Sequence, residues 1–353
     1  MRDGTGGETP VSRKVQFMQV FDARIYEIVE KALEGNGLTE QETLELYSVP
    51  ETSKEAAYIR WAGQELSMQA TGGIAEIHAQ IGLNASTCPK DCIFCSFARI
   101  NDVRKGVYEV PKEDVLEYAK LYVEEGANLI LVLTTASYKF EKLEDMVGSV
   151  REVIPADMPL LVNTEDMTLE RAQRLKAAGA QGAYHAVRMR EGVDTTIPVE
   201  NRMKTFEHMR EAGLKLSTCV EPVGPEHTPE ELTEATFRCI RSNPKTSGVG
   251  RRIGVPGTKI YDRGMITDVA NANMVAIYRL ATGLDYLLNC SANTALTAAS
   301  GANLAWAEVG TNPRDTVERT EHGGRGASLA QQRKMFQAGG WEVRQGPSQG
   351  WFD

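Results

Sequence analysis

The sequence predicts an α/β fold, a closed (β/α)8 TIM barrel, from three observations. Short apolar runs alternate with helical ones eight times along the chain, and strands that alternate with helices form a parallel sheet. Three of the helices end in glycine just before the next strand (EEGANL, KAAGAQG and REAGLKL), and glycine there supplies the left-handed cap that returns the chain to the sheet. No GxGxxG turn follows the first strand, which disfavours an open doubly wound sheet.

The predicted barrel lies between two other segments. Residues 1–70 are expected to form an N-terminal helical extension, in which Thr39 and Glu42 have the spacing of a capping box. Residues 71–320 are expected to form the barrel, and residues 321–353 a C-terminal tail. The Gly-rich loop around HGGRG is a candidate lid over the barrel mouth, with Arg314 and Arg325 as anion contacts. A linker before a last packing helix is the simpler alternative.

The strands are expected in eight short segments. Each is followed by a helical pattern, except where the last strand leads into a polar loop before its helix. The segments read IAEIHAQIG, NLILVLTT, PLLVNT, GAYHAVR, KLSTCVEP, SGVGRRIGV, DYLLNCS and NLAWAEVG.

Composition excludes several classes of protein. The 353 residues carry a net charge of −9, which argues against a general binder of nucleic acid or anionic membrane. No apolar run is long enough for a membrane span, and the first residues do not form a signal peptide, so we expect a cytoplasmic protein. Six cysteines in a chain of this length do not indicate a disulfide framework.

Three of the six cysteines fall within eight residues, in the segment CPKDCIFC directly after the first strand. In a barrel this places Cys88, Cys92 and Cys95 at the C-terminal mouth, where active sites lie. Thiolates bind iron–sulfur clusters and zinc. Three thiolates on a [4Fe–4S] cluster would leave one iron open for another molecule. The alternative is a zinc site that a remote residue such as His227 or His322 completes.

The segment CPKDCIFC resembles the signature of the radical SAM superfamily, and the resemblance covers about residues 70–320. It implies a [4Fe–4S] cluster on the three cysteines and S-adenosylmethionine (SAM) as second cofactor. It also implies reductive cleavage of SAM, a hydrogen atom taken from a small-molecule substrate, and an electron donor such as flavodoxin or ferredoxin. In the family the aromatic residue of the signature, here Phe94, lies beside the adenine.

The wording of this segment, the eight strand–helix units and the segment VENR are similar to the biotin-synthase-like branch of the superfamily, which includes biotin synthase, the [FeFe]-hydrogenase maturase and methylornithine synthase. The resemblance implies that Arg202 of VENR pairs with the SAM carboxylate, a role that suits its planar fork. A solvated helix arginine is the alternative. It further implies SAM contacts from the LTTASY turn and from an acidic residue after the fourth strand. The candidates are Thr135, Ala136, Ser137 and Glu191.

The remaining cysteines distinguish the chain from biotin synthase itself. That enzyme carries further cysteines on its second, third and fifth strands, where this chain has Leu133, Val162 and Ser217. Cys219 and Cys290 could meet inside the barrel and hold an auxiliary cluster, or they could be small apolar filler. Cys239 lies in a helical pattern and is expected to be filler.

Polar residues at the carboxyl ends of strands are candidates for substrate binding. Consecutive arginines on the sixth strand suggest a substrate with a carboxylate or phosphate, or else ion pairs to Glu221 or Glu165. The expected reaction is a rearrangement, a lyase reaction or a step of cofactor biosynthesis. The alternatives are a sulfur-inserting synthase or a non-catalytic iron–sulfur or zinc scaffold. The candidates are Asn163, Glu165, His185, Glu221, Arg251, Arg252 and Asn289.

Overall fold

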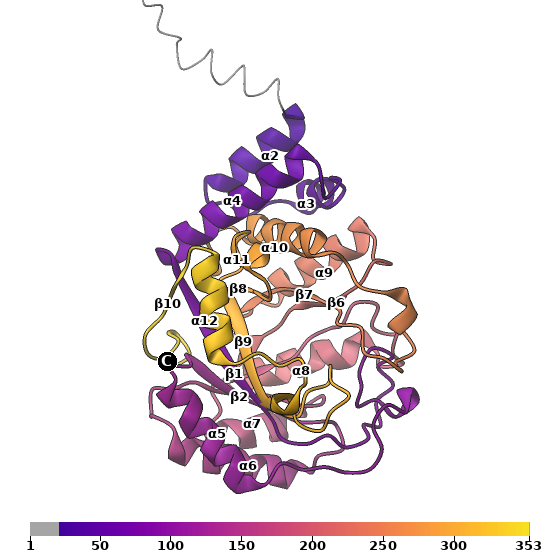
Figure 1. The fold of residues 1–353 in the computed structure, drawn as a ribbon, viewed down its shortest axis with the longest axis vertical. Helices are drawn as coiled ribbons and strands as arrows, with labels where there is room; N and C mark the ends of the chain where they lie inside the picture. The colour runs from indigo at the N-terminus through magenta and orange to yellow at the C-terminus, as the bar shows by residue number, and fades with distance from the viewer. Residues whose placement is uncertain (1–20, 353) are drawn as a thin grey trace, which may run out of the picture.

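The computed structural model describes residues 21–352 (Figure 1). Nine strands follow one another around a single sheet, which a short tenth strand joins at β1, and all of its pairs are parallel, as the alternation of strands and helices predicts. The strands are β1 (Ile74–Gly82), β2 (Leu129–Leu133), β3 (Leu160–Asn163), β4 (Gly182–Tyr184), β5 (Lys215–Ser217), β6 (Val220–Val223), β7 (Ser247–Arg251), β8 (Asn289–Cys290) and β9 (Leu304–Gly310).

The sheet closes on itself at the fifth predicted strand. The spatial order is β5-β4-β3-β2-β1-β9-β8-β7-β6, and β5 and β6 are consecutive pieces of one segment, separated by Thr218 and Cys219. Ser217 bridges to Thr246, so this segment has neighbours on both sides. Pro222 lacks the N–H that a regular ladder needs, and the register between β6 and β7 shifts there. The predicted (β/α)8 barrel is confirmed, with its fifth strand split in two.

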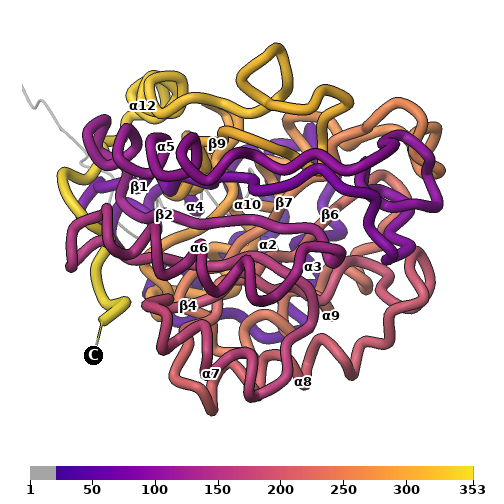
Figure 2. Tube along the Cα trace, turned by 90° about the horizontal axis from the view of Figure 1, so that it is seen from below, coloured from indigo at the N-terminus to yellow at the C-terminus, as the bar shows by residue number. Residues whose placement is uncertain are grey.

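Helices cover the outside of the sheet. Figure 2 follows the outer helices in chain order from α5 and α6 to α7, α8 and α9. Apolar residues of these helices pack on the outward side chains of the strands, as Leu143 and Val147 of α6 do in one cluster with Ile130 and Val132 of β2. The helices are α5 (Lys112–Glu124), α6 (Phe140–Val153), α7 (Leu169–Ala177), α8 (Val199–Glu211), α9 (Pro229–Arg241), α10 (Asp268–Thr282), α11 (Ala295–Ala298) and α12 (Leu329–Ala338).

From residue 21 onward, three helices precede the barrel, namely α2 (Ala23–Leu33), α3 (Glu40–Tyr47) and α4 (Lys54–Thr71). The capping box predicted for Thr39 and Glu42 is present at the start of α3. The three helices share an apolar cluster with α10, so they pack against one side of the barrel (Figure 1). Within residues 21–352 no helix combines the length and apolarity that crossing a membrane requires.

The C-terminal residues close the end of the barrel that lies opposite the mouth. After α12, the short strand β10 (Glu342–Val343) pairs with the first two residues of β1. Trp351 is 1% exposed and lies against Gly182 at the start of β4. Arg344 Nε donates to Glu76 Oε1 at 2.7 Å. Trp351 belongs to the apolar cluster inside the barrel, which extends to Cys88 at the mouth.

Candidate active site at the barrel mouth

The three signature cysteines lie on the loop between β1 and α5. Backbone bonds fold this loop tightly: Cys88 N donates to Phe97 O at 2.7 Å, and Cys95 N donates to Cys92 O at 3.1 Å. The Nδ2 of Asn101 donates to both Cys92 O and Cys95 O, at 3.1 and 2.8 Å. All three thiols are free of disulfides, and Cys88 and Cys95 pack with the apolar cluster inside the barrel.

The thiols suit a cluster that supplies positive charge. Burial, and then the neighbouring Cys95, raise the pKa of Cys92 to about 12, and burial raises the pKa of Cys95 to about 11. Thiolates therefore become stable here only when a metal neutralises them. The positive charge of a bound metal group would stabilise the buried thiolates in place of water.

The three thiols do not form a compact group of zinc ligands. Tetrahedral zinc with Zn–S bonds near 2.3 Å would hold its sulfurs about 3.8 Å apart. Within residues 21–352, the group of metal-ligand atoms that lie within 4.8 Å of one another consists of Asp194, Glu226 and His227 and includes no cysteine. His322 is exposed on a 3-10 turn. Wider spacing fits a [4Fe–4S] cluster, in which each thiolate binds a different iron.

Arg202 lies in the first turn of α8, with a side chain only 9% exposed. Its Nε and Nη2 donate to Glu191 at 3.2 and 3.3 Å, and its Nη1 donates to Asp166 at 2.9 Å. These bonds use three of the five N–H groups of a guanidinium. One N–H remains on each terminal nitrogen, the number that a carboxylate accepts in a bidentate pair.

Glu191, a predicted SAM contact, is instead a buried partner of Arg202. Its side chain is 0% exposed and also accepts from Arg188 N at 2.8 Å and from Thr195 Oγ1 at 3.0 Å. These bonds occupy both carboxylate oxygens. The structure therefore places Glu191 behind the arginine.

His185, a predicted substrate contact, supports the same arginine through Asp166. Its Nε2 lies 3.0 Å from the Asp166 oxygen that Arg202 also contacts. Burial opposes ionisation of Asp166, but the bonds from His185 and Arg202 outweigh it and lower the pKa of the carboxyl to about 2. Burial lowers the pKa of His185, which keeps the ring neutral. The Nε2 must then carry the proton and donate it to the carboxylate.

The turn after β2 is held by Asn84, which follows β1. Asn84 Oδ1 accepts from Thr135 N at 2.9 Å, and its Nδ2 donates to Thr135 Oγ1 at 2.8 Å. Thr135 Oγ1 and Ser137 Oγ are 2.8 Å apart. Ala136 and Ser137 follow at the mouth, half-buried and exposed respectively. These hydrogen bonds hold the turn after β2, where the sequence predicted contacts with SAM, in one conformation.

A second polar group lies inside the barrel. Glu221 accepts hydrogen bonds from Tyr184 and from Arg188, and the Arg188 guanidinium lies 5.8 Å from the centre of the Tyr184 ring. Burial raises the pKa of Tyr184 well above its usual value, so the phenol stays protonated and donates. Asn163 ends β3, where alternation turns its side chain inward beside Leu161.

The other predicted substrate residues have partners of their own. Glu165 pairs with Arg171 at 3.1 Å and with Lys90 at 3.7 Å. Arg251 pairs with Asp268, and Arg252 pairs with Glu226, so the costly arginine pair is neutralised by acids other than those the sequence suggested. Asn289 faces outward, and its Nδ2 donates to Val275 O and Gly301 O at 3.0 and 3.1 Å.

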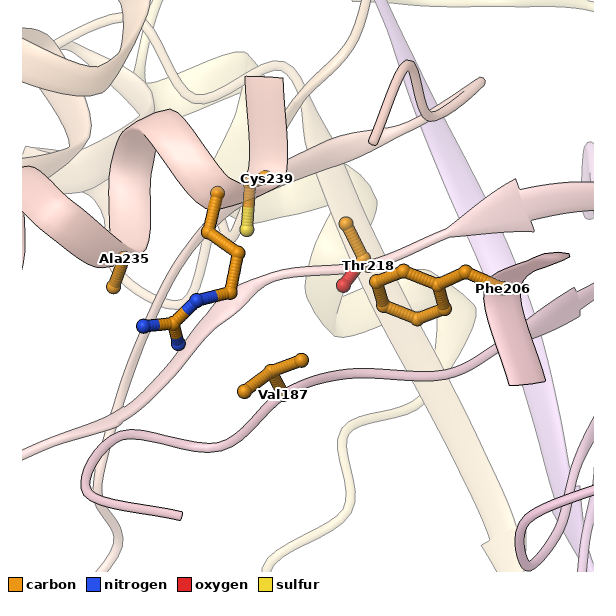
Figure 3. Close-up of a pocket in the computed structure, with 6 residues that line it drawn as sticks. Val187, Phe206, Thr218, Ala235 and Cys239 are labelled. Carbon is orange, nitrogen blue, oxygen red and sulfur yellow. The ribbon is translucent and has the colours of Figure 1, made fainter. Parts of the chain in front are cut away.

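The spare cysteines divide as the sequence suggested. Cys219 and Cys290 are buried in the interior cluster, and their thiols are close enough to hydrogen-bond. Cys239 lies on α9 and lines a small recess with Phe206, Thr218 and Arg238 (Figure 3). That recess has room for about one water molecule, so the structure places Cys239 among packing residues.

The loop after β9 contacts the loop that carries the cysteines at several points: Ser96 N donates to Pro313 O at 3.0 Å, and Thr311 Oγ1 donates to Asn84 O at 2.8 Å. Arg314 pairs with Glu308, and Arg325 N donates to Asp315 Oδ1 at 2.7 Å. Glu308 also accepts from Gln80 Nε2 at 3.2 Å. The guanidinium of Arg314 is thus engaged with the chain itself.

Sequence reasoning missed four residues of this region: Asn84, Asp166, Tyr184 and Arg188. Asp166 directly follows Glu165, which was predicted as a substrate contact after the third strand. The inward position of Tyr184 follows from alternation along β4. The contacts of Asn84 and Arg188 join distant segments, and no local pattern marks them.

Comparisons with known proteins agree with this geometry. The family model of the Radical SAM superfamily matches residues 85–239. Biotin synthase of Rhodopirellula baltica is 25% identical over 261 residues, which cover 71% of each chain. Biotin synthase of Nitrosopumilus maritimus is 24% identical over 264 residues, which cover 72% of this chain and 78% of that one.

Two solved structures share the fold. The FeFe-hydrogenase maturase HydG from Carboxydothermus hydrogenoformans has a TM-score of 0.73 at 17% identity, covering 94% of this chain and 83% of its own. Methylornithine synthase has a TM-score of 0.69 at 15% identity, covering 79% and 85%.

A parallel barrel with a three-cysteine loop at its mouth is the arrangement expected of a radical SAM enzyme, and residues 85–239 of the chain match the model of that superfamily. The curated relatives that it resembles over about 70% of its length are biotin synthases. The family implies the use of SAM and a [4Fe–4S] cluster.

Proposed function

We propose that Cys88, Cys92 and Cys95 hold a [4Fe–4S] cluster and that the chain cleaves SAM reductively to act on a small metabolite or cofactor precursor. The observation that carries this proposal is the position of three free thiols at the mouth, near the charge of Arg202. When bound, the cluster would supply one electron for the reductive cleavage of SAM, the chemistry that allows a hydrogen atom to be taken from the substrate.

Arg202 would hold the carboxylate of SAM. Its two remaining N–H groups provide a fork of the right geometry. Glu191 and Asp166 are positioning residues, since they fix the guanidinium in place. The two carboxylates also offset the desolvation cost of burying the charged guanidinium.

The rest of the SAM site would come from two loops. Phe94 stands between two cysteine ligands and is half-buried, so its ring is available to the adenine. Thr135, Ala136 and Ser137 would meet the amino group of SAM through backbone and hydroxyl oxygens. Asn84 is the positioning residue of that turn because it fixes Thr135 by two hydrogen bonds.

The substrate would bind deeper in the barrel. Asn163 and the Tyr184–Glu221–Arg188 group offer polar contacts beside Cys219 and Cys290. Tyr184 and Arg188 both donate hydrogen bonds to Glu221 and fix the position of its carboxylate. The fixed carboxylate could then orient a polar group of the substrate. Arg251, Arg252 and Asn289 are already engaged by other residues, which favours a structural role for them.

The proposal is tested by an anaerobic turnover screen of the reconstituted protein with deuterated candidate substrates. We expect deuterium to enter 5′-deoxyadenosine with one class of substrate, and variants at Glu221 to reduce that transfer. If SAM and a strong reductant give no 5′-deoxyadenosine at all, the enzyme is excluded and a binding scaffold remains.

A sulfur-inserting reaction is the second candidate, and the proximity of Cys219 and Cys290 favours it. Iron counting separates the two reactions: about four irons per chain fit one [4Fe–4S] cluster, and clearly more fit an additional one. We expect about four irons, unchanged in the double variant Cys219→Ser, Cys290→Ser. Loss of iron in this variant would support the second candidate.

A further inference from the structure

Two surface segments, residues 99–107 and 257–265, lie side by side next to the cysteine loop. Lys259 N donates to Asn101 Oδ1 at 3.0 Å, and Gly257 lies against the Val103 side chain. The same Asn101 donates through Nδ2 to the carbonyls of Cys92 and Cys95. This surface, which we call the reductant face, is therefore fixed directly to the loop that carries the thiols.

The reductant face is positive although the whole chain has a net charge of −9. Its basic residues are Arg99, Arg104, Lys105, Lys259 and Arg263, and its acidic residues are Asp102 and Asp262. Arg263 pairs with Asp194 at 3.1 Å and with Glu226 at 3.4 Å, so the positive charge of the face comes from the other four basic residues. Lys105 pairs with Asp102 at 3.4 Å, with both side chains about three-quarters exposed. A negative chain repels an acidic protein over most of its surface, so a local positive face selects where such a partner approaches.

The reductant face also exposes large apolar side chains. Ile100, Val107, Tyr261 and Met265 are 40, 76, 45 and 46% exposed. They lie among the basic residues on both segments. Apolar groups surrounded by charge are typical of a protein–protein contact.

We propose that the reductant face docks a small acidic one-electron carrier protein that reduces the cluster. This inference rests on the proposed function, because it needs a cluster on Cys88, Cys92 and Cys95. In the step itself no bond forms or breaks: the carrier is oxidised by one electron, and the cluster is reduced by one. The basic residues would steer the acidic carrier, and the apolar residues would hold it beside the cysteine loop.

The test measures cluster reduction directly, by anaerobic stopped-flow absorbance on reconstituted full-length protein. The probe is an acidic flavodoxin that has been photoreduced beforehand. The test variant is Lys105→Glu, Lys259→Glu. The matched control is Lys334→Glu, an exposed lysine on α12, and a variant of opposite sign is Asp102→Asn.

At low salt we expect the double variant to lower the second-order rate constant at least tenfold and Asp102→Asn to raise it. The difference should nearly vanish at 1 M salt, where the Debye length is about 3 Å. The rate of cluster reduction by dithionite should stay within about twofold of the wild-type rate in every variant. This result would show that each variant folds and holds its cluster. A rate constant for the double variant within twofold of that for Lys334→Glu would overturn the docking site.

The readout also separates this inference from the proposed function. Cluster reduction by flavodoxin can slow in the double variant whether or not SAM is cleaved. A failure of the wild-type protein to form 5′-deoxyadenosine with dithionite would instead contradict the proposed function and leave the docking result standing.

Discussion

Arg202 Nη1 and Asp166 Oδ1 lie 2.9 Å apart, and this bond ties the first turn of α8 to the loop after β3. Asp166 holds the arginine from one side and Glu191 from another. An arginine that is itself buried and that bonds a buried and a half-buried acid is not the solvated helix residue that the sequence left open. Its guanidinium is held in place before any ligand binds, so a carboxylate of SAM would meet a fork that is already oriented.

Replacing Arg202 by lysine should weaken SAM binding while the charge is kept. A lysine ammonium has no planar fork and cannot bond two acids and a carboxylate together. We expect the Kd for SAM to rise about tenfold or more, measured by equilibrium binding to the reconstituted protein. The exposed Arg210 on the same helix provides the control, Arg210→Lys, which should leave the Kd unchanged. Equal affinities for both variants would rule out this role of Arg202.

Stability should depend on pH through His185. Burial lowers the pKa of the folded imidazole below its usual 6.5, whereas the unfolded chain takes up a proton near that value. The contribution of His185 is therefore complete above pH 6.5 and is lost as the pH falls through the lowered folded pKa. We expect the thermal unfolding midpoint to fall between pH 7.5 and 5.5.

The matched variant is His185→Gln, whose amide can still donate to Asp166 but does not titrate. Its midpoint should fall less over the same pH range, at the same scan rate. Parallel curves for the two proteins would show that another group causes the dependence.

Trp351 should contribute strongly to stability although it is the third residue from the C-terminus. Its ring is 1% exposed at the closed end of the barrel, and its Nε1 donates to Ser348 Oγ at 3.1 Å. We expect Trp351→Ala to lower the free energy of unfolding by about 3–5 kcal/mol, measured in urea. The adjacent Phe352 is 42% exposed, so Phe352→Ala should change it by less than about 0.5 kcal/mol. Similar losses in both variants would contradict this packing.

Much of the barrel could be predicted because its signals are local. The first strand was predicted at the residues 74–82 that β1 occupies, and the capping box at Thr39 follows from residues three apart. The split of the fifth strand could not be predicted, since it depends on which neighbour each half meets. The docking of Trp351 likewise depends on a contact with Gly182, far away in the sequence.

In the candidate site, too, the sequence revealed local features but not contacts between distant segments. Three cysteines in eight residues carry their own signal. The partners of Arg251 and Arg252 are instead set by loops after other strands, and periodicity does not reveal such contacts. Residue type indicated that the arginines need acids, but not which ones.

The central claim is that the three thiols hold a cluster that cleaves SAM. Its most direct test is the formation of 5′-deoxyadenosine by anaerobically reconstituted protein with SAM and dithionite, quantified by chromatography. We predict product from the wild type and from Cys239→Ala, whose cysteine lies on the outer helix α9, and none from Cys92→Ala, which should also lose its cluster absorbance. Equal product from Cys92→Ala and the wild type, or none from the wild type, would contradict the account.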